Sequence, residues 1–343
     1  MILPDSIWRV GMAMAAVGFL SACFGDESEP APAGQGEGAY AGQCGIRVDS
    51  YIVVDFYSKK ILSSHQATTR RQVASLTKIA TAMVTLDWAE RTGSSLYQQA
   101  TVPGSITQIG GANPMGMQPG DQISLREALY ASVIGSDNAA AQTLATHVGR
   151  DLLLRSGRGA DPVTAFVGEM NSLIVNQGAV DTKFTNPHGM DHQGEAPYST
   201  AADMARLAIY AMGKASFRFY ASQTERKISY SRGGRARSFL MKNTNKLLGV
   251  DSIDGVKTGM TRRAGPCLIT SAARENSVIE EADGRTRVVP HRLVVVVLGS
   301  SERFKASRSL LKRGWQKYDQ WAAGGRIIRG QEELLGSSPV ARQ

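Results

Sequence analysis

Residues 74–83 read ASLTKIATAM and place a serine and a lysine three positions apart, where an apolar pattern with helical spacing begins. The pattern continues to residue 90, so residues 75–90 predict a helix with one buried face. Positions i and i+3 share a face of a helix, which brings the Lys78 amine within reach of the Ser75 hydroxyl. The stretch predicts either a serine nucleophile with a lysine base, or a helix cap followed by a surface lysine.

The Ser-x-x-Lys spacing alone is weak evidence, because SLLK at residues 309–312 repeats it in the predicted C-terminal helix. Two further motifs follow the first one in order, SDN at residues 136–138 and KTG at residues 257–259. SDN separates two predicted helices, 125–135 and 138–149, and KTG begins a predicted strand. Three motifs in this order and setting are typical of penicillin-binding proteins and class A β-lactamases.

These motifs supply the groups that acyl transfer by a serine requires. We expect Ser75 to be the nucleophile and Lys78 its base, once burial or a neighbouring cation such as Lys257 lowers the pKa of Lys78. We expect Ser136 to relay the proton to the leaving group, and Asn138 to orient Lys78 and the substrate amide. The positive N-terminal end of the helix favours the alkoxide and the oxyanion.

The third motif is expected to hold the substrate. Lys257 and Thr258 bind its carboxylate, and Gly259 lets its backbone lie flat along the strand. By analogy with penicillin-binding proteins, the backbone N–H groups of Ser75 and Met260 are expected to bind the oxyanion. Each motif taken singly also has a purely structural interpretation, as a helix cap, a turn or a strand edge.

Strands are predicted at both ends of the chain, with helices between them. Alternating or continuously apolar runs predict strands at 51–57, 60–65, 255–260, 267–273 and 291–299, with a polar hairpin at 274–290. Helical spacing marks 75–90, 125–135, 138–149, 162–177 and 301–322. Thr200 and Asp203 have the spacing of a helix cap, and residues 226–231 and 238–243 suggest a smaller region of strands or loops. We therefore expect an α/β fold of the α+β type. Its mainly antiparallel sheet comes from both chain ends, is flanked by helices and carries an inserted helical subdomain.

Longer segments resemble one family, the D-alanyl-D-alanine carboxypeptidases, or low-molecular-mass penicillin-binding proteins. The resemblance covers roughly residues 48–320 and includes YIVVDFYSKKIL (51–62), FTNPHGMD (184–191) and LVVVVLGSSERF (293–304) besides the three motifs. It implies the β-lactamase/penicillin-binding transpeptidase-like fold. It also implies a serine peptidase, without a cofactor, that removes the terminal D-alanine from peptidoglycan stem peptides and is covalently inhibited by β-lactam antibiotics.

Three other functions compete with this one. A D,D-endopeptidase of the same family would differ only in the shape of its cleft. A β-lactamase needs a deacylating glutamate in an E-x-x-L-N context, and the nearest candidate, Glu169 in GEMNSL, lacks that pattern. A non-catalytic penicillin-sensing lipoprotein has no need of Lys78. His188, in NPHG, is either a turn-stabilising residue or a substrate contact.

The N-terminus predicts export and a lipid anchor. An apolar run at residues 10–20 is too short to span a bilayer easily, and LSAC follows it, which resembles the lipobox of bacterial lipoproteins. We expect Cys23 to be lipidated and the protein to be held on the periplasmic side of a membrane, plausibly the outer one. The expected division is a signal peptide (1–22), a lipidated tether (23–45), a catalytic domain (46–323) and an unstructured tail (324–343).

Composition narrows the remaining possibilities. Hydrophobic residues make up 42% and charged residues 20% of the 343 residues, as in a globular chain. The net charge is +9, but the basic residues look scattered along the sequence, so we expect no nucleic-acid partner. No CxxC or HExxH spacing occurs, so we expect no metal. Cys44 and Cys267 are left as a possible disulfide pair.

Overall fold

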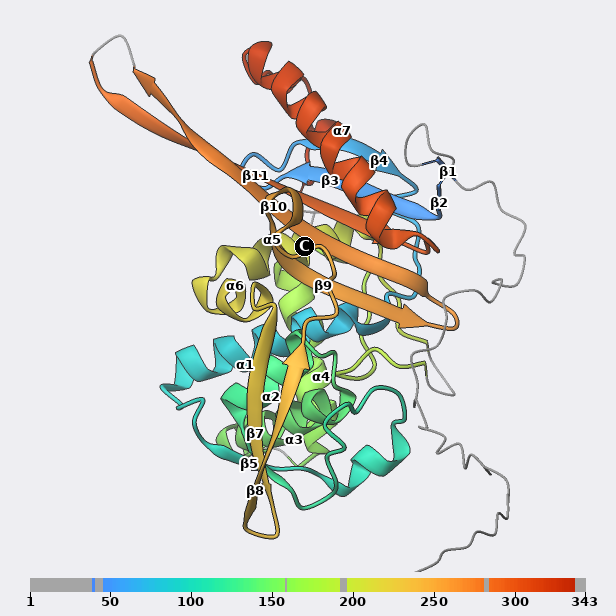
Figure 1. The fold of residues 1–343 in the computed structure, drawn as a ribbon, viewed down its shortest axis with the longest axis vertical. Coiled ribbons are helices and arrows are strands. Elements are labelled where there is room, and N and C mark those ends of the chain that lie inside the picture. Colours follow the sequence, from blue (N-terminus) through green and yellow to red (C-terminus); the bar gives the residue numbers. More distant parts are fainter. Residues whose placement is uncertain (1–38, 41–45, 158, 192–195, 281–283, 337–343) are drawn as a thin grey trace, which may run out of the picture. The chain divides into compact units, whose positions relative to one another are not determined.

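A five-stranded antiparallel sheet, in the order β4-β3-β11-β10-β9, is central to this computed structural model (Figure 1). The structure describes residues 39–40, 46–157, 159–191, 196–280 and 284–336. The sheet strands are β3 (Ser50–Asp55), β4 (Ile61–His65), β9 (Ile253–Thr261), β10 (Gly265–Glu280) and β11 (Thr286–Leu298). Two of them precede the helices in the chain and three follow most of them, so the expected sheet from both chain ends is confirmed.

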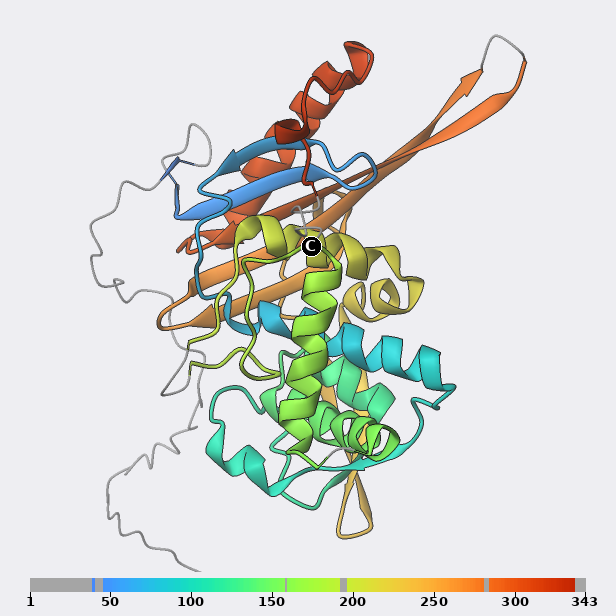
Figure 2. The same cartoon turned by 180° about the vertical axis from the view of Figure 1, so that it is seen from behind.

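Helices cover both faces of this sheet. Along β11, Val294 and Val296 belong to the core on one face, while Val295 and Val297 belong to the core on the other. Helix α7 (Arg303–Ala323) packs on the second face, and Figure 2 shows the opposite side, where α5 (Ala201–Gly213) contacts β11. A strand buried on both faces must be apolar throughout, which explains the unbroken LVVVVL run.

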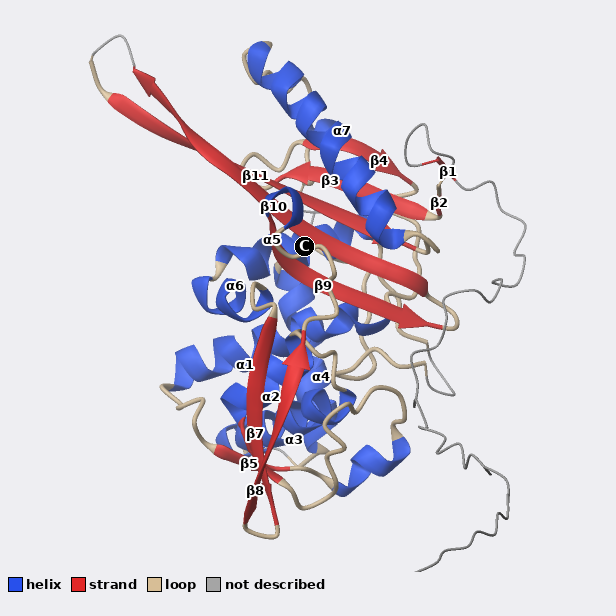
Figure 3. Ribbon diagram, viewed as in Figure 1, coloured by secondary structure: helices blue, strands red, loops and turns tan. Residues whose placement is uncertain are grey.

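The helices between β4 and β9 form the expected helical insertion (Figure 3). Side-chain caps fix where several of them begin. Thr200 accepts from the N–H of Asp203, as the sequence predicted, and Ser124 accepts from the N–H of Glu127. The elements are η1 (Ala74–Thr77), α1 (Lys78–Thr92), η2 (Gly104–Gln108), α2 (Leu125–Val133), α3 (Asn138–Ser156), α4 (Pro162–Asn176) and α6 (Ala215–Ala221).

A second antiparallel sheet, in the order β5-β6-β7-β8, lies against the helical part. Its strands are β5 (Gln99–Thr101), β6 (Gln122–Ser124), β7 (Glu225–Arg232) and β8 (Arg235–Lys242). The last two form a hairpin with β8 at the edge, in the region where the sequence predicted strands or loops. Short elements complete the fold: β1 (Ala39–Tyr40) paired with β2 (Arg47–Val48), η3 (Val250–Ser252) and η4 (Gln331–Glu333).

Of two predictions for regions outside the core, the hairpin at 274–290 is confirmed and the unstructured tail is not. The expected polar hairpin is present, because β10 and β11 continue as a two-stranded ribbon beyond the sheet (Figure 1). The expected unstructured tail is wrong as far as residue 336. Leu334 forms a bridge with Lys60, the Leu335 side chain is buried, and the Arg206 guanidinium donates to the Gly336 carbonyl at 3.0 Å.

Candidate active site

Ser75 and Lys78 meet at the start of the first long helix. Ser75 lies in the 3-10 turn η1, and Lys78 is the first residue of α1. Positions i and i+3 eclipse each other in a 3-10 turn, so the two side chains stand together. The Lys78 Nζ donates to the Ser75 Oγ at 3.0 Å. The contact expected from the sequence spacing is therefore present.

The Lys78 ammonium is buried among acceptors from three different segments. Besides Ser75, it donates to Asn138 Oδ1 at 2.6 Å and to the His188 carbonyl at 2.8 Å. Burial lowers the pKa of Lys78 to about 7, although the Asp137 carboxylate opposes this shift. Near neutral pH an appreciable fraction of the amine is thus unprotonated and able to accept a proton.

The SDN motif lies where α2 ends and α3 begins. Asn138 Nδ2 donates to the Gly110 carbonyl at 3.0 Å, which holds its Oδ1 toward Lys78. Asp137 caps α3 by accepting from the Ala140 N–H at 2.9 Å, and burial raises the pKa of Asp137 to about 6. Ser136 adopts a left-handed φ of 58°. Its hydroxyl makes no hydrogen bond within the described part of the chain, so its relay role stays a prediction.

The KTG motif brings a second buried lysine to the site. Lys257 Nζ donates to the Thr258 carbonyl at 3.1 Å, and Thr258 Oγ1 donates to Thr244 Oγ1 at 2.6 Å. Burial, followed by the charges of Lys78 and Arg303, holds the pKa of Lys257 well below its usual range. Burial is also the cause of the lowered pKa of Lys78, which decides between the two causes, burial or a neighbouring cation, that the sequence left open.

Gly259 is needed by the protein itself. A Cβ at this position would lie 2.9 Å from the Val73 carbonyl oxygen and 3.1 Å from the backbone nitrogens of Ser75 and Leu76. The missing side chain therefore lets β9 approach the turn that carries the serine. The sequence predicts that this glycine makes room for a substrate backbone, but it gives no sign of the close contact with the turn at residues 73–76. Met260 follows on β9 with its side chain 65% exposed.

Sequence reasoning also missed Arg303, the first residue of α7. Its guanidinium donates to the Gly259 carbonyl at 3.0 Å and adds positive charge beside Lys257. The resemblance in LVVVVLGSSERF contained this arginine, but nothing in its local pattern indicated a contact with β9. The site thus gathers basic side chains from three elements, Lys78, Lys257 and Arg303, and such groups suit an anionic group on a substrate.

The loop at 184–191 positions the His188 carbonyl, which accepts a hydrogen bond from Lys78. Asn186 Oδ1 accepts from the N–H of Gly189 at 2.7 Å, and His188 Nδ1 accepts from the N–H of Met190 at 3.2 Å. The His188 side chain is buried, and its backbone carbonyl is what reaches Lys78. Of the two interpretations of His188, these contacts favour the structural one.

Other sequence candidates lie away from these contacts or outside the described residues. Glu169 pairs with Arg91 at 3.7 Å on the surface. Cys23 and Cys44 lie outside the described residues, so lipidation and the disulfide both stay predictions. The Cys267 thiol is buried, which raises its pKa to about 11.

Among the described helices, none combines the length and the apolar character needed to cross a membrane.

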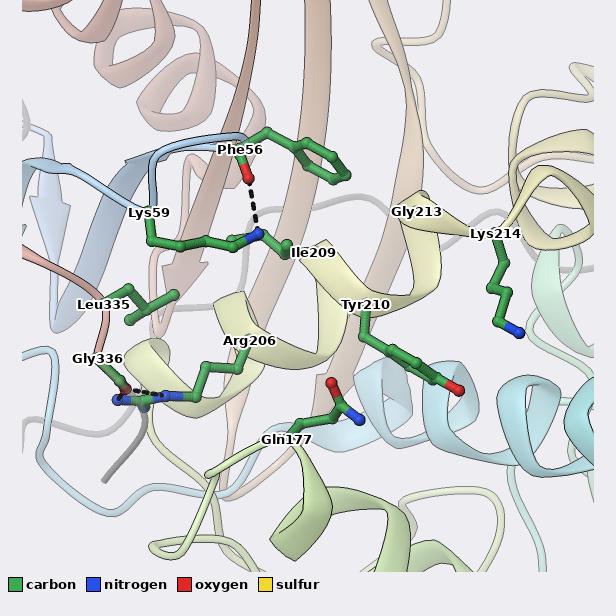
Figure 4. A pocket seen from close by; sticks show the side chains of 10 residues that line it. All are labelled: Phe56, Lys59, Gln177, Arg206, Ile209, Tyr210, Gly213, Lys214, Leu335 and Gly336. Carbon is green, nitrogen blue, oxygen red and sulfur yellow. Dashed lines mark hydrogen bonds between the residues drawn. The ribbon is translucent and has the colours of Figure 1, made fainter. Parts of the chain in front are cut away.

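A cavity of about 560 Å³ lies beside α5 and contains no motif residue (Figure 4). Phe56 and Lys59 line one part of it, and the C-terminal segment closes another. The residues of α5 that face it include Arg206 and Ile209. This cavity is therefore separate from the serine and lysine site.

Comparison with known proteins identifies the family. The sequence pattern of D-alanyl-D-alanine carboxypeptidases matches residues 38–281 and so contains all three motifs. The chain belongs to this family. DacC of Escherichia coli K12, a D-alanyl-D-alanine carboxypeptidase, is 30% identical over 284 residues, which are 79% of this chain and 62% of DacC. DacA of the same organism is 30% identical over 240 residues, or 66% of this chain and 53% of DacA.

The matched region thus spans less than two thirds of either relative. Among solved structures, the DD-transpeptidase of Streptomyces K15 superposes with a TM-score of 0.66 at 26% identity, covering 79% of this chain and 98% of that one. This similarity confirms the expected penicillin-binding transpeptidase-like fold. The family match likewise confirms the resemblance drawn from the motifs.

Proposed function

We propose that this protein is a serine D-Ala-D-Ala carboxypeptidase that trims peptidoglycan stem peptides. One observation carries the proposal: a fully buried lysine amine, with a pKa of about 7, stands 3.0 Å from the hydroxyl of Ser75. A lysine in this state can activate a serine without a histidine. Family membership and the names of the relatives support the same reaction.

In the proposed acylation, Ser75 Oγ attacks the carbonyl carbon before the terminal D-alanine and its proton passes to Lys78 Nζ. The N–H groups of Ser75 and Met260 stabilise the oxyanion. The C–N bond then breaks, and the leaving amine takes the proton through Ser136. Asn138 holds Lys78 in place during these transfers. Deacylation follows when water attacks the ester, gives a proton to Lys78 and releases the shortened peptide as Ser75 regains its own.

The terminal carboxylate of the substrate binds at Lys257 and Thr258, with Arg303 close by. Without substrate, burial and then the nearby charges of Lys78 and Arg303 lower the pKa of Lys257. An arriving carboxylate reverses this effect, because an opposite charge favours the protonated amine. Binding therefore selects substrates that end in a free carboxylate, as a stem peptide does.

Purified protein incubated with a stem pentapeptide tests the proposal. We expect release of one D-alanine per peptide, no release by Ser75→Ala, and full release by Ser309→Ala, which alters the second SxxK sequence. Fluorescent penicillin should label the wild type and Ser309→Ala but not Ser75→Ala. Labelling of Ser75→Ala would show that another residue is the nucleophile.

A transpeptidase is the second candidate, because the similar Streptomyces K15 structure is that of a DD-transpeptidase. Both reactions share the acyl-enzyme and differ in whether water or an amine attacks it. A crosslinked dimer and an added amine acceptor, supplied in parallel with the pentapeptide, distinguish three activities. Free tetrapeptide indicates a carboxypeptidase, a new amide indicates a transpeptidase, and monomers from the dimer indicate the endopeptidase alternative.

We also propose that Cys23 carries a lipid that holds the enzyme on the periplasmic side of a bacterial membrane. The apolar run at residues 10–20, followed by LSAC, supports this anchor. Membrane fractionation and intact mass of a Cys23→Ser variant test it. The variant should move to the soluble fraction and lose the mass of the lipid. An unchanged distribution and mass would exclude the anchor.

A further inference from the structure

The positive charge of the chain is concentrated on one hairpin, formed by β7 and β8. Residues 225–242 hold six lysines and arginines and a single acid, so they contribute +5 to the net charge of +9. The sequence alone made the basic residues look scattered. Pairing of the two strands places these six side chains on one narrow ribbon that lies along the helical part (Figure 1).

Most of these six basic side chains make no ion pair or aromatic contact within the described part of the chain. Arg232 pairs with Asp121 at 2.7 Å, and the Arg226 guanidinium lies 4.7 Å from the ring centre of Tyr130. The remaining four side chains are exposed, and none has an ion pair within the part of the chain that the structure describes. These four are Lys227, Arg235, Arg237 and Lys242.

β8 is also the edge strand of its sheet, so one side of its backbone is not paired in the sheet. Every residue from 235 to 240 is exposed, including Phe239 at 36% and Leu240 at 52%. An edge strand can accept a further extended chain through backbone hydrogen bonds, while its side chains select the partner. Here the side chains favour an anionic partner with some apolar surface.

β8 leads directly into the active site. Met241 packs against Gly135, next to Ser136, so closely that a Cβ on Gly135 would overlap its sulfur. Two residues after the strand, Thr244 accepts the hydrogen bond of Thr258 in the KTG motif. The basic strand therefore runs outward from a point between the second and third motifs.

We propose that β8 is a docking strand for the anionic peptides of the peptidoglycan polymer, adjacent to the peptide being cleaved. This inference rests on the proposed function. Each uncleaved stem peptide ends in a carboxylate, so the polymer presents repeated negative charges on extended chains. The strand matches both features, since one side of its backbone is not paired in the sheet and its unpaired cations extend from the hairpin turn toward the second and third motifs.

Electrostatic docking of this kind acts on the capture of the polymer and leaves the chemical step unchanged. It is long in range only at low salt, because the screening length is about 10 Å at 0.1 M and about 3 Å at 1 M ionic strength. We expect a short soluble peptide to bind at the three motifs without extending along β8. Charge reversal on β8 should therefore affect polymeric substrate selectively.

The test compares Arg235→Glu/Arg237→Glu with a matched control, Lys312→Glu/Lys317→Glu on α7. Both pairs are charge reversals that change the net charge equally. D-alanine release is measured from insoluble sacculi and from a short soluble acyl-D-Ala-D-Ala peptide, at low and high salt. We expect the β8 variant alone to lose about tenfold in rate on sacculi at low salt. It should retain its rate on the short peptide and match the wild type at high salt.

Equal rates of the β8 variant and the control on sacculi would overturn the proposal, and so would an equal loss of the β8 variant on both substrates. Arg235→Gln/Arg237→Gln guards against misfolding and should show an intermediate loss. Sedimentation of Ser75→Ala protein with sacculi measures docking without catalysis. The docking proposal can therefore be tested even if the carboxypeptidase assay fails. If charge reversal abolishes binding to vesicles of anionic phospholipid but not to sacculi, the strand binds membranes and the proposal is wrong.

Discussion

The amine of Lys78 is buried, and burial decides the pH at which it can take a proton from Ser75. Its pKa is lowered to about 7, so the amine is mainly protonated and inactive as a base below that pH. We expect the second-order rate of acylation by benzylpenicillin to rise with pH and to level off above about 7. Well below this pH the rate should fall by about tenfold per pH unit.

Stopped-flow or quench measurements between pH 5 and 8 check this dependence. Lys78→Arg is a suitable comparison, because a guanidinium stays protonated throughout and cannot act as a base. A wild-type rate that is flat or falls with increasing pH in this range would contradict the role of Lys78 as a base.

A single methyl group at Gly259 should disturb both stability and acylation. Its Cβ would lie 2.9 Å from the Val73 carbonyl oxygen, so β9 and the serine turn must move apart. For Gly259→Ala we expect a loss of about 1–3 kcal/mol in the free energy of unfolding, together with slower acylation. Urea unfolding and penicillin labelling measure the two effects.

Gly168 provides the matched control, because it lies in α4 and a Cβ there meets nothing within 4 Å. Gly168→Ala should leave acylation unchanged and stabilise the protein by about 0.5–1 kcal/mol, since alanine is the better helix former. If Gly259→Ala behaves in the same way, the close approach of β9 to the turn is unimportant.

The contact that the sequence predicted correctly joins two residues that are close together in the chain. The spacing of Ser75 and Lys78 follows from one helical turn, and it predicted their contact. Arg303 and the His188 carbonyl were missed, because each reaches the site from a segment more than a hundred residues away from Lys78. The cause of the lowered pKa of Lys78 was left open for a similar reason, since burial is created by the packing of distant elements.

At the level of elements, apolar runs and caps predicted the core helices and strands well, whereas the segment after α7 was predicted wrongly. Residues 324–336 are rich in glycine and charge, which suggested an unstructured tail. The segment also contains two apolar pairs, Ile327–Ile328 and Leu334–Leu335, and of these four residues only Leu335 is buried. The segment is held by the burial of Leu335, the ion pair of Lys60 with Glu333, and the bond from Arg206 to Gly336.

Leu335→Ala should therefore destabilise the protein by about 2 kcal/mol, the low end for a buried leucine. For a chain of this size this corresponds to a Tm lower by about 3 °C. Ile327→Ala is the control, because the Ile327 side chain is 61% exposed and should contribute little. Differential scanning calorimetry distinguishes the two variants. Equal Tm values would mean that the segment is not docked in solution.

In the whole molecule, the site forms where the helical insertion meets β9, the edge strand of the five-stranded sheet. SDN comes from the break between α2 and α3, KTG comes from β9, and the serine turn lies between them. The sequence predicted that the three motifs act together, because their order and setting are typical of penicillin-binding proteins. It did not predict the basic hairpin next to them, because strand pairing brings those charges together.

This assembly also determines the fate of a bound penicillin. Penicillin presents a carboxylate for Lys257 and a strained amide for Ser75, so acylation should be quick. The opened ring stays attached and blocks the path of water, and release then requires another base. Within the described residues, the only side chain that hydrogen-bonds to the Ser75 and Lys78 pair is that of Asn138, which is not a base. Glu169 is engaged with Arg91 at the surface.

A positioned general base is typically worth about a hundred-fold to ten-thousand-fold in rate, so its absence should leave a long-lived adduct. We expect benzylpenicillin to inactivate the protein with one equivalent and to consume very little further drug. Intact-protein mass spectrometry over time should show the added mass on wild type and Ser309→Ala, and none on Ser75→Ala. Rapid loss of the adduct, with many equivalents of penicillin hydrolysed, would instead identify a β-lactamase and require a deacylating base that these contacts do not include.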